Sequence, residues 1–194
     1  MEQSTIIRII RIVLIIVVLG LLIWFIIWLF SPKQSTPPPE TPADTSAQQE
    51  QYDTVRYVQD GEITAPETHY SIVITVSATS RRIEIYQGYN SAPLRSESYT
   101  NSSASYDAYY AALKNVGFFA VRDDPNNTDR TSYCPLGIRY SYLAGNDISD
   151  PELNSWSASC SAKAGTFAGN KADVKTLFKK QIPDYTNFVK GITL

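Results

Sequence analysis

An uninterrupted apolar run of nineteen residues, 12–30 (IVLIIVVLGLLIWFIIWLF), constrains this chain more than any other feature. As an α-helix it would be about 28 Å long, which matches the hydrocarbon core of a bilayer. The run contains no charged side chain, and a helix satisfies its own backbone hydrogen bonds, as lipid requires. We therefore expect a single transmembrane helix over residues 12–30.

The residues that flank this run predict how the helix is used. A cleaved signal peptide has a shorter apolar core followed by a small-residue cleavage site, whereas this run leads directly into Ser31 and Pro32. We therefore expect an uncleaved anchor. Arg8 and Arg11 precede the run, and a single lysine follows it closely. The positive-inside rule then places residues 1–11 in the cytoplasm as a short tail, and everything after the helix outside the cell membrane.

Residues 31–50 (SPKQSTPPPETPADTSAQQE) form a spacer between the predicted helix and a folded domain. Five of these twenty residues are proline, and none is aromatic or branched aliphatic. A segment of this composition cannot bury enough apolar surface to repay the entropy of ordering, and its prolines favour extended polyproline II. We predict a disordered, Pro-rich stalk. The domain that follows, residues 51–194, contains all thirteen tyrosines of the chain.

Several segments of this domain have the alternation and the β-branched content of strands. Residues 70–77 (YSIVITVS) and 81–87 (RRIEIYQ) are separated by three residues and predict a β-hairpin. Further strands are expected at residues 94–99, 118–122, 138–143 and 155–161.

Two other segments show the 3.6-residue period of amphipathic helices. The first has Ser103 or Ser105 as its candidate N-cap and ends at Gly117. The second spans 171–181 and stops before Pro183, because a proline disfavours helical geometry in the residue that precedes it. The order of strands, helix, strands and helix predicts an α+β fold: a two-layer domain with an antiparallel sheet and two main helices on one face.

Cys134 and Cys160 are the two cysteines of the chain. In an extracytoplasmic, oxidising environment a pair of cysteines indicates a disulfide. The alternatives are a free reactive thiol and a metal ligand. The one histidine, His69, is remote in sequence and is expected in a linker before the hairpin, which argues against a metal site. A disulfide requires the two Cα atoms to lie about 4.4–6.8 Å apart.

Motifs for catalysis and for metal binding are weak. A nucleophile needs a base held against it, and no G-x-S-x-G elbow surrounds any serine. The acidic segments 123–130 and 146–152 lack the glycine and glutamate spacing of an EF-hand. We interpret them as solvated turns, with calcium binding as the alternative. We expect no catalytic residues, no metal and no cofactor.

A basic surface is predicted on the second helix, where Lys171, Lys175 and Lys179 stand at i, i+4 and i+8. Residues 163–190 hold six lysines and two aspartates, a net charge of +4. The simpler interpretation is the solvated face of an amphipathic helix. The functional interpretation is a binding patch for an anionic wall polymer, for lipid headgroups or for an acidic protein.

Tyr89 and Tyr133 are further candidates for this binding patch. Both are expected in turns or at strand ends, and tyrosine is a residue that binding surfaces use often. Nucleic acid is not an expected partner, because the chain has a net charge of −2 and carries no recognition motif.

The layout of a short basic N-terminus, one apolar span, a Pro/Thr stalk and a small two-cysteine domain resembles uncharacterised single-pass surface proteins of very small, host-dependent bacteria. The stretches that carry the resemblance are CPLGIRYSYL, WSASC with GTFAG, and LFKKQIPDY. The resemblance implies a location in the cell envelope and assigns no catalytic residue.

Together these features predict a membrane-anchored surface protein whose outer domain binds an envelope or cell-surface component without catalysis. The expected partners are the bilayer, through residues 12–30, and a protein or an anionic wall polymer. One alternative is a bitopic subunit of an envelope machine for pilus assembly, secretion or division. A second alternative is an extracytoplasmic hydrolase.

Overall fold

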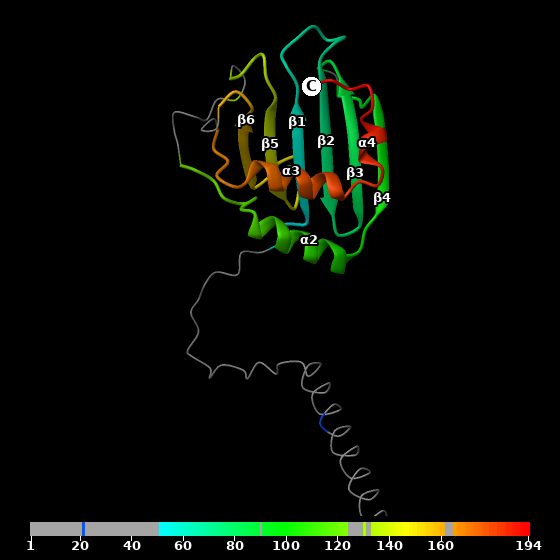
Figure 1. The fold of residues 1–194 in the computed structure, drawn as a ribbon, viewed down its shortest axis with the longest axis vertical. Coiled ribbons are helices and arrows are strands. Elements are labelled where there is room, and N and C mark those ends of the chain that lie inside the picture. The colour runs from blue at the N-terminus through cyan, green and yellow to red at the C-terminus, as the bar shows by residue number, and fades with distance from the viewer. Residues whose placement is uncertain (1–20, 22–50, 90, 124–129, 131–132, 162–164) are drawn as a thin grey trace, which may run out of the picture. The chain divides into compact units, whose positions relative to one another are not determined.

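The computed structural model describes residues 51–89, 91–123, 130, 133–161 and 165–194, together with Leu21 (Figure 1). Apart from Leu21, which is helical, the predicted transmembrane helix and stalk lie outside the described residues. Within the described part of the chain, no helix is long and apolar enough to cross a membrane. The chain divides into two units, Met1–Gln48 and Gln49–Leu194, and the second contains every strand among the described residues.

Six strands form one sheet, in the spatial order β4-β3-β2-β1-β5-β6 (Figure 1). Their bounds are Thr54–Asp60 for β1, Tyr70–Ser77 for β2, Ser80–Gln87 for β3, Arg95–Thr100 for β4, Arg139–Gly145 for β5 and Leu153–Ala158 for β6. Every neighbouring pair is antiparallel. Strand β1 lies inside the sheet, because it pairs with β2 on one side and with β5 on the other.

The alternation of side chains along the strands gives the sheet one buried face. In β1, Val55, Tyr57 and Gln59 are buried and alternate with more exposed residues. Tyr57 stands opposite Ile74 of β2 and Tyr142 of β5. Residues directly opposite in neighbouring strands point to the same side of a sheet, so these side chains share one face. That face forms the main core.

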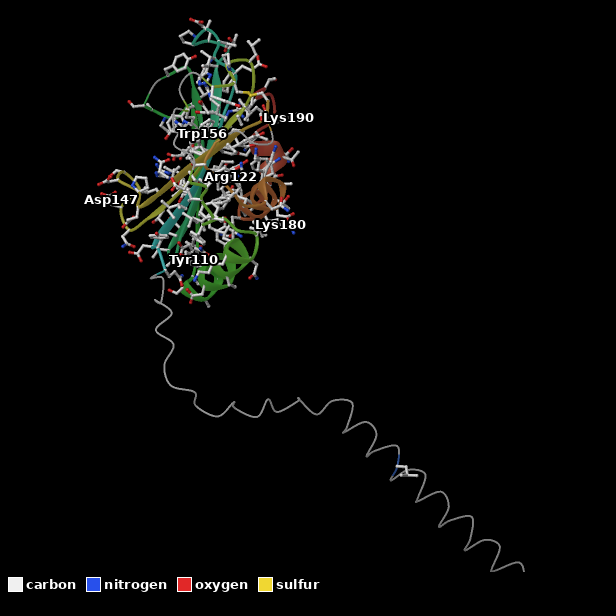
Figure 2. The ribbon with its side chains drawn as sticks, turned by 90° about the vertical axis from the view of Figure 1, so that its left-hand side faces the viewer. Tyr110, Arg122, Asp147, Trp156, Lys180 and Lys190 are labelled. Carbon is white, nitrogen blue, oxygen red and sulfur yellow. A yellow bond between two sulfur atoms is a disulfide. The ribbon has the colours of Figure 1, made fainter. Side chains whose placement is uncertain are left out.

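Three helices lie on the side of this buried face, green, orange and red in Figure 2. They are α2 (Ser103–Asn115), α3 (Lys171–Lys180) and α4 (Tyr185–Phe188). Phe178 of α3 is fully buried, and its ring centroid lies 5.3 Å from that of Tyr57 and 5.6 Å from that of Tyr109 in α2. One side chain thus joins the sheet to both long helices. The antiparallel sheet with helices confirms the predicted α+β class.

The predicted strand at 118–122 is wrong. Only Val121 makes an isolated bridge, with Phe167. The reason is that Phe118 is buried in the core, where its ring packs 5.6 Å from that of Phe178. Phe118 therefore packs against a helix of the core, and the segment does not form a strand.

Strand β1 was not predicted, because its sequence does not alternate between apolar residues for the buried face and polar residues for the exposed face. Gln59 is polar and faces the core, whereas Val58 is apolar and lies on the opposite face. At the start of α2 the N-cap is Ser102, whose hydroxyl accepts from the backbone N–H of Ser105 at 3.3 Å. The cap is therefore one residue before the nearer of the two predicted candidates.

The opposite face of the sheet is partly covered over β5 and β6. Tyr133 and Cys134 pack against Trp156 and Ala158, and the rings of Tyr133 and Trp156 meet edge to face at 5.4 Å. Cys134 is bonded to Cys160, with the two Cα atoms 6.0 Å apart. This separation falls within the range that a disulfide requires and confirms the predicted pair.

Reducing the Cys134–Cys160 bond should destabilise the domain, because the two cysteines are 26 positions apart in the chain. The chain-entropy model gives about 3–4 kcal/mol for a loop of this size. Thermal unfolding of the full-length protein in detergent, with and without reductant, should show a lower Tm in the reduced sample. The control is the C134S/C160S variant, whose Tm should already be low and insensitive to reductant. Equal melting of oxidised and reduced wild-type protein would contradict the prediction.

The core is rich in buried tyrosines, which makes the fold sensitive to alkali. Burial raises the pKa of Tyr142 to about 12, and it raises the pKa of Tyr57 and of Tyr109 well above its ordinary value. In an unfolded chain the same phenols ionise near pH ~10. The unfolded state therefore releases protons that the folded state keeps. The stability that these neutral phenols provide is present below about pH 10 and is lost as the pH rises from about 10 through about 12.

Two substitutions in α2 should separate ionisation from hydrogen bonding. The hydroxyl of Tyr109 is buried without a hydrogen-bond partner among the described residues, whereas that of Tyr106 donates to the Tyr52 carbonyl at 2.7 Å. At neutral pH, Y109F should leave the free energy of unfolding unchanged or raise it, while Y106F should lower it by about 0.5–1.5 kcal/mol. Y109F should also reduce the loss of stability above about pH 10. Urea unfolding at neutral and alkaline pH measures both effects, and a larger neutral-pH loss in Y109F than in Y106F would contradict them.

Candidate binding site at the apical loops

Three loops meet at one end of the sheet because neighbouring strands run in opposite directions. Strands β1 and β3 end there, and β2, β4 and β5 begin there. The loops are residues 61–69, 88–94 and 133–138, of which residue 90 is outside the described set, and we call them the apical loops. Thr54, where the chain enters β1, is at the other end of that strand.

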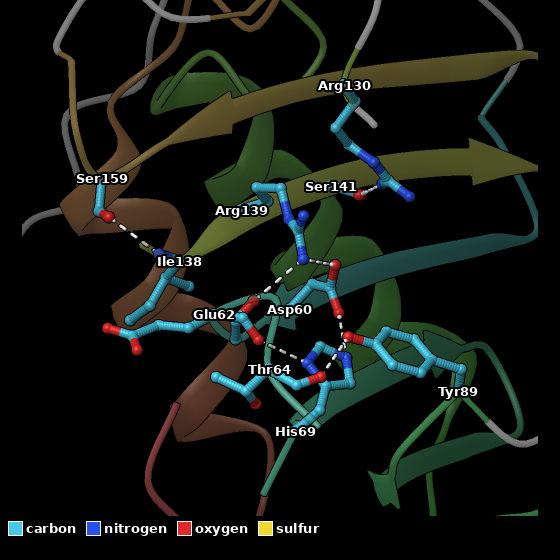
Figure 3. Close-up of polar contacts among 11 residues, drawn as sticks. Asp60, Glu62, Thr64, His69, Tyr89, Arg130, Ile138, Arg139, Ser141 and Ser159 are labelled. Atoms are coloured by element: carbon cyan, nitrogen blue, oxygen red, sulfur yellow. Dashed lines mark hydrogen bonds and ion pairs between the residues drawn. The ribbon is translucent and has the colours of Figure 1, made fainter. Parts of the chain in front are cut away.

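A buried ion-pair network holds the first apical loop (Figure 3). Arg139, at the start of β5, donates from Nη2 to Asp60 Oδ2 at 2.7 Å and to the Gly61 carbonyl at 3.0 Å. His69, the residue before β2, has its Nε2 3.2 Å from the other carboxylate oxygen of Asp60. The side chains of Arg139 and His69 are buried. One carboxylate therefore joins the ends of three strands.

His69 has an acceptor at each ring nitrogen. Its Nδ1 lies 2.7 Å from the Glu62 carbonyl oxygen, which can only accept, so Nδ1 carries a proton. Its Nε2 faces the Asp60 carboxylate, with Oδ1 at 3.2 Å. Both ring nitrogens are therefore directed at oxygens of the protein itself. His69 does precede the hairpin, as expected, but it is a buried structural residue.

Direct contacts join the three apical loops into one surface. The Tyr89 ring stacks on His69, with the centroids 4.4 Å apart, and its hydroxyl donates to the Thr64 carbonyl at 2.9 Å (Figure 3). These two contacts tie the second loop to the first. The backbone N–H of Ile63 donates to the Pro135 carbonyl at 2.7 Å, which ties the first loop to the third. The Cys134–Cys160 bond fixes the third loop to the end of β6.

This surface exposes four large apolar side chains: Ile63 (41%), Tyr89 (60%), Leu94 (51%) and Leu136 (79%). Beside them is an open hollow of about 350 Å³, lined by Pro66, Glu67, Gln87, Ala92, Pro93 and Leu94. Large apolar side chains gathered on an exposed surface are typical of sites where another molecule binds. The apical loops are therefore the candidate binding site.

The charge of the apical loops indicates what kind of surface they suit. Residues 61–69, 88–94 and 133–138 contain Glu62 and Glu67 but no lysine or arginine, and both glutamates are exposed. An anionic polymer or an anionic lipid surface would be repelled by these carboxylates. An apolar surface with basic residues at its rim would be attracted.

The predicted binding residues belong to two different surfaces. Tyr89 and Tyr133 both lie in the apical loops, the first exposed and the second partly buried against Trp156. The three predicted lysines lie on α3. Among the described residues, no hydrogen bond or ring contact links these tyrosines to these lysines.

The lysines themselves differ in their surroundings. Lys171 donates from Nζ to the carbonyls of Ala158 and Ser161, at 3.3 and 3.4 Å, so it secures the end of β6. Lys179 lies over the ring of Tyr185 at 4.7 Å. Burial and the charge of Lys175, one helical turn away, lower the pKa of Lys179.

Ile63, Leu94 and Leu136 were not predicted as binding residues. Each is a single apolar residue in a loop, and nothing in its neighbours distinguishes it from a residue packed in the core. One signal was present: the three loops share an absence of basic residues. It could be used only once the strand order had brought the loops together.

Removing the charge of Asp60 should destabilise the domain strongly. The D60N variant keeps the shape of the side chain but leaves the buried Arg139 without a counter-charge, and breaking a buried pair in this way costs about 3–5 kcal/mol. The matched control is D150N in the exposed β5–β6 turn, which should change stability by less than about 0.5 kcal/mol. Urea unfolding of the full-length protein measures both. Similar stabilities for the two variants would show that the network does not hold the loops.

No family model matches this sequence, and neither the curated proteins nor the solved structures include a significant match. The resemblance to surface proteins of host-dependent bacteria stays a prediction. The function must therefore be inferred from the geometry and charge of the domain itself.

Proposed function

We propose that this is a membrane-anchored surface protein whose outer domain binds a protein of the envelope or of another cell surface, without catalysis. The observation that carries the proposal is the group of four exposed apolar side chains on the apical loops, held in place by the Asp60 network. In this proposal residues 12–30 are the anchor, the N-terminal tail is cytoplasmic, and the domain is extracytoplasmic.

The direction of β1 suits such a role. The stalk joins the domain at the end of the sheet where β1 begins, and the apical loops lie at the other end, about 20 Å along a seven-residue strand. Within the domain, the apical loops are thus at the end of β1 opposite to Thr54.

A protein partner fits these loops better than a polymer does. The large apolar side chains exposed on these loops are Ile63, Leu94 and Leu136, together with the ring of Tyr89. Side chains of this kind gain binding energy by leaving water, and aromatic residues are enriched at protein interfaces. The two glutamates of the surface favour a partner with basic residues around an apolar centre.

The surroundings of His69 support a non-catalytic role. A hydrolase of the Ser-His or Cys-His type needs an imidazole with a free nitrogen beside its nucleophile. Here both nitrogens face acceptors, the ring is buried under Tyr89, and both cysteines are joined to each other. The chain has no second histidine to take this role.

The test is site-specific photo-crosslinking from the apical surface in native membranes. A benzophenone amino acid at position 136 should yield a discrete protein adduct of the full-length chain, while one at the exposed position 121, outside the apical loops, should not. Adding L94S should weaken the adduct from position 136 by about tenfold or more, because a buried leucine side chain contributes about 1.5–3 kcal/mol. The matched control is V121S, which changes an exposed valine elsewhere and should leave the adduct intact.

Two outcomes would contradict the proposal. An adduct formed only with lipid or polysaccharide would exclude a protein partner at the apical loops. Equal adducts from positions 136 and 121, unaffected by L94S, within a stoichiometric complex of membrane proteins would instead favour a bitopic subunit of an envelope machine.

A further inference from the structure

A second surface of the domain is formed by the two C-terminal helices. Between α3 and α4 is a groove of about 440 Å³, lined by Thr176, Lys179, Lys180, Tyr185, Thr186 and Val189. Figure 2 shows Lys180 and Lys190 on the helical side of the domain. Because these helices cover the core face of the sheet, the groove is separate from the apical loops, and we call it the lysine groove.

The groove's Lys179 and Lys180, and Lys175 one turn before Lys179, form no ion pair with the residues that the structure describes. The described residues form three ion pairs, and the basic partner in each is a histidine or an arginine. Among these residues, therefore, no carboxylate lies within 4.0 Å of Lys175, Lys179 or Lys180. The acid closest in sequence to Lys179 and Lys180 is Asp184, which accepts two hydrogen bonds from Asn187, at 2.8 and 2.9 Å. Lys175 and Lys179 stand one helical turn apart, where like charges repel.

The side chains of the groove are also held in place. The ammonium of Lys179 lies 4.7 Å from the centre of the Tyr185 ring, and a cation over a ring face is attracted to it. The hydroxyl of Tyr185 accepts a hydrogen bond from the buried Gln59 of β1 at 3.4 Å, which fixes the ring. Lys179 is therefore positioned at the groove by an element of the core.

A contribution to the stability of α3 explains the positions of only some of these lysines. Lys179 and Lys180 are in the last turn of α3, where positive charge stabilises the helix dipole. Lys175 is one turn earlier, and its repulsion with Lys179 has no such benefit. Cations kept together in a hollow without counter-ions are typical of a site for an anion.

We propose that the lysine groove binds a linear polyanion whose charged groups are phosphates. Lysine ammonium groups bind phosphate as point charges, and the groove offers at least two of them with the Thr186 hydroxyl beside them. A linear polyanion carries charges in succession, so it can form ion pairs with several of the lysines that are spaced along α3 and at its end. The proposal is independent of the protein partner at the apical loops, because it concerns another surface with the opposite charge.

The test uses the full-length protein in neutral detergent and fluorescently labelled polyphosphate as the probe. Fluorescence anisotropy should show binding that weakens as salt is added, since polyanion binding releases counter-ions. K179Q/K180Q should weaken binding by about tenfold and lower the salt slope by about one to two. K179R/K180R should restore most of the affinity, because it restores the charge.

The matched control removes two positive charges elsewhere. K114Q/R82Q changes Lys114 on α2 and Arg82, which strand alternation places on the face of the sheet opposite the helices. It should leave the affinity within about twofold of wild type. Thermal melting of each variant checks that the fold is retained.

Three results would overturn the proposal. The first is that the wild-type protein does not bind polyphosphate, and the second is that K179Q/K180Q and K114Q/R82Q lose the same affinity for it. The third is that poly-glutamate competes for the protein as well as unlabelled polyphosphate does, which would assign the groove to carboxylates. The L94S/L136S variant should bind polyphosphate like wild type. The failure of one surface can thus be distinguished from the failure of the other.

Discussion

Strand β1 is the element on which the rest of the domain depends. It pairs with β2 on one side and β5 on the other, and so joins the meander of β1 to β4 to the hairpin of β5 and β6. Its Tyr57 faces the core, where Phe178 of α3 packs on it. Its last residue, Asp60, anchors Arg139 and His69. The same seven residues therefore connect the sheet, the helical layer and the apical loops.

The Asp60 network uses a buried charge to fix the position of a loop. Placing the Arg139 guanidinium out of water has a large desolvation cost, which the Asp60 carboxylate and the Gly61 carbonyl offset. What the domain gains is a fixed position for loop 61–69, whose first and last residues, Gly61 and His69, both contact this network. The stacking of Tyr89 on His69 then transmits that position to the neighbouring loop. A rigid loop surface loses less entropy on binding than a mobile one does.

The domain presents two surfaces of opposite character. The apical loops expose four large apolar side chains and two glutamates. The lysine groove is lined by Lys179 and Lys180, which form no ion pair within the described part of the chain. Their two hollows share no lining residue. The two proposals accordingly give them different ligand classes: an apolar, basic protein surface for the first and a phosphate polyanion for the second.

Local patterns in the sequence predicted much of the fold. The hairpin at 70–77 and 81–87 and the two long helices follow from alternation and from the 3.6-residue period, since each pattern depends only on nearby residues. Strand β1 could not be recognised, because Gln59 is buried through its contact with Tyr185, which is 126 positions away. The segment 118–122 has the composition of a strand, yet Phe118 is held by Phe178 of a distant helix.

The sequence by itself determined that an apolar span and a proline-rich spacer precede an α+β domain, because hydropathy and composition can be read from neighbouring residues. It also determined that the two cysteines are paired, because the chain has only these two. Only the tertiary structure decided which loops meet. Ile63, Leu94 and Leu136 come from three separated segments, and only the antiparallel strand order gathers them at one end of the sheet. It also separated Tyr89 and Tyr133 from the lysines of α3, because a sheet and a helix that pack face to face direct their exposed side chains to different surfaces.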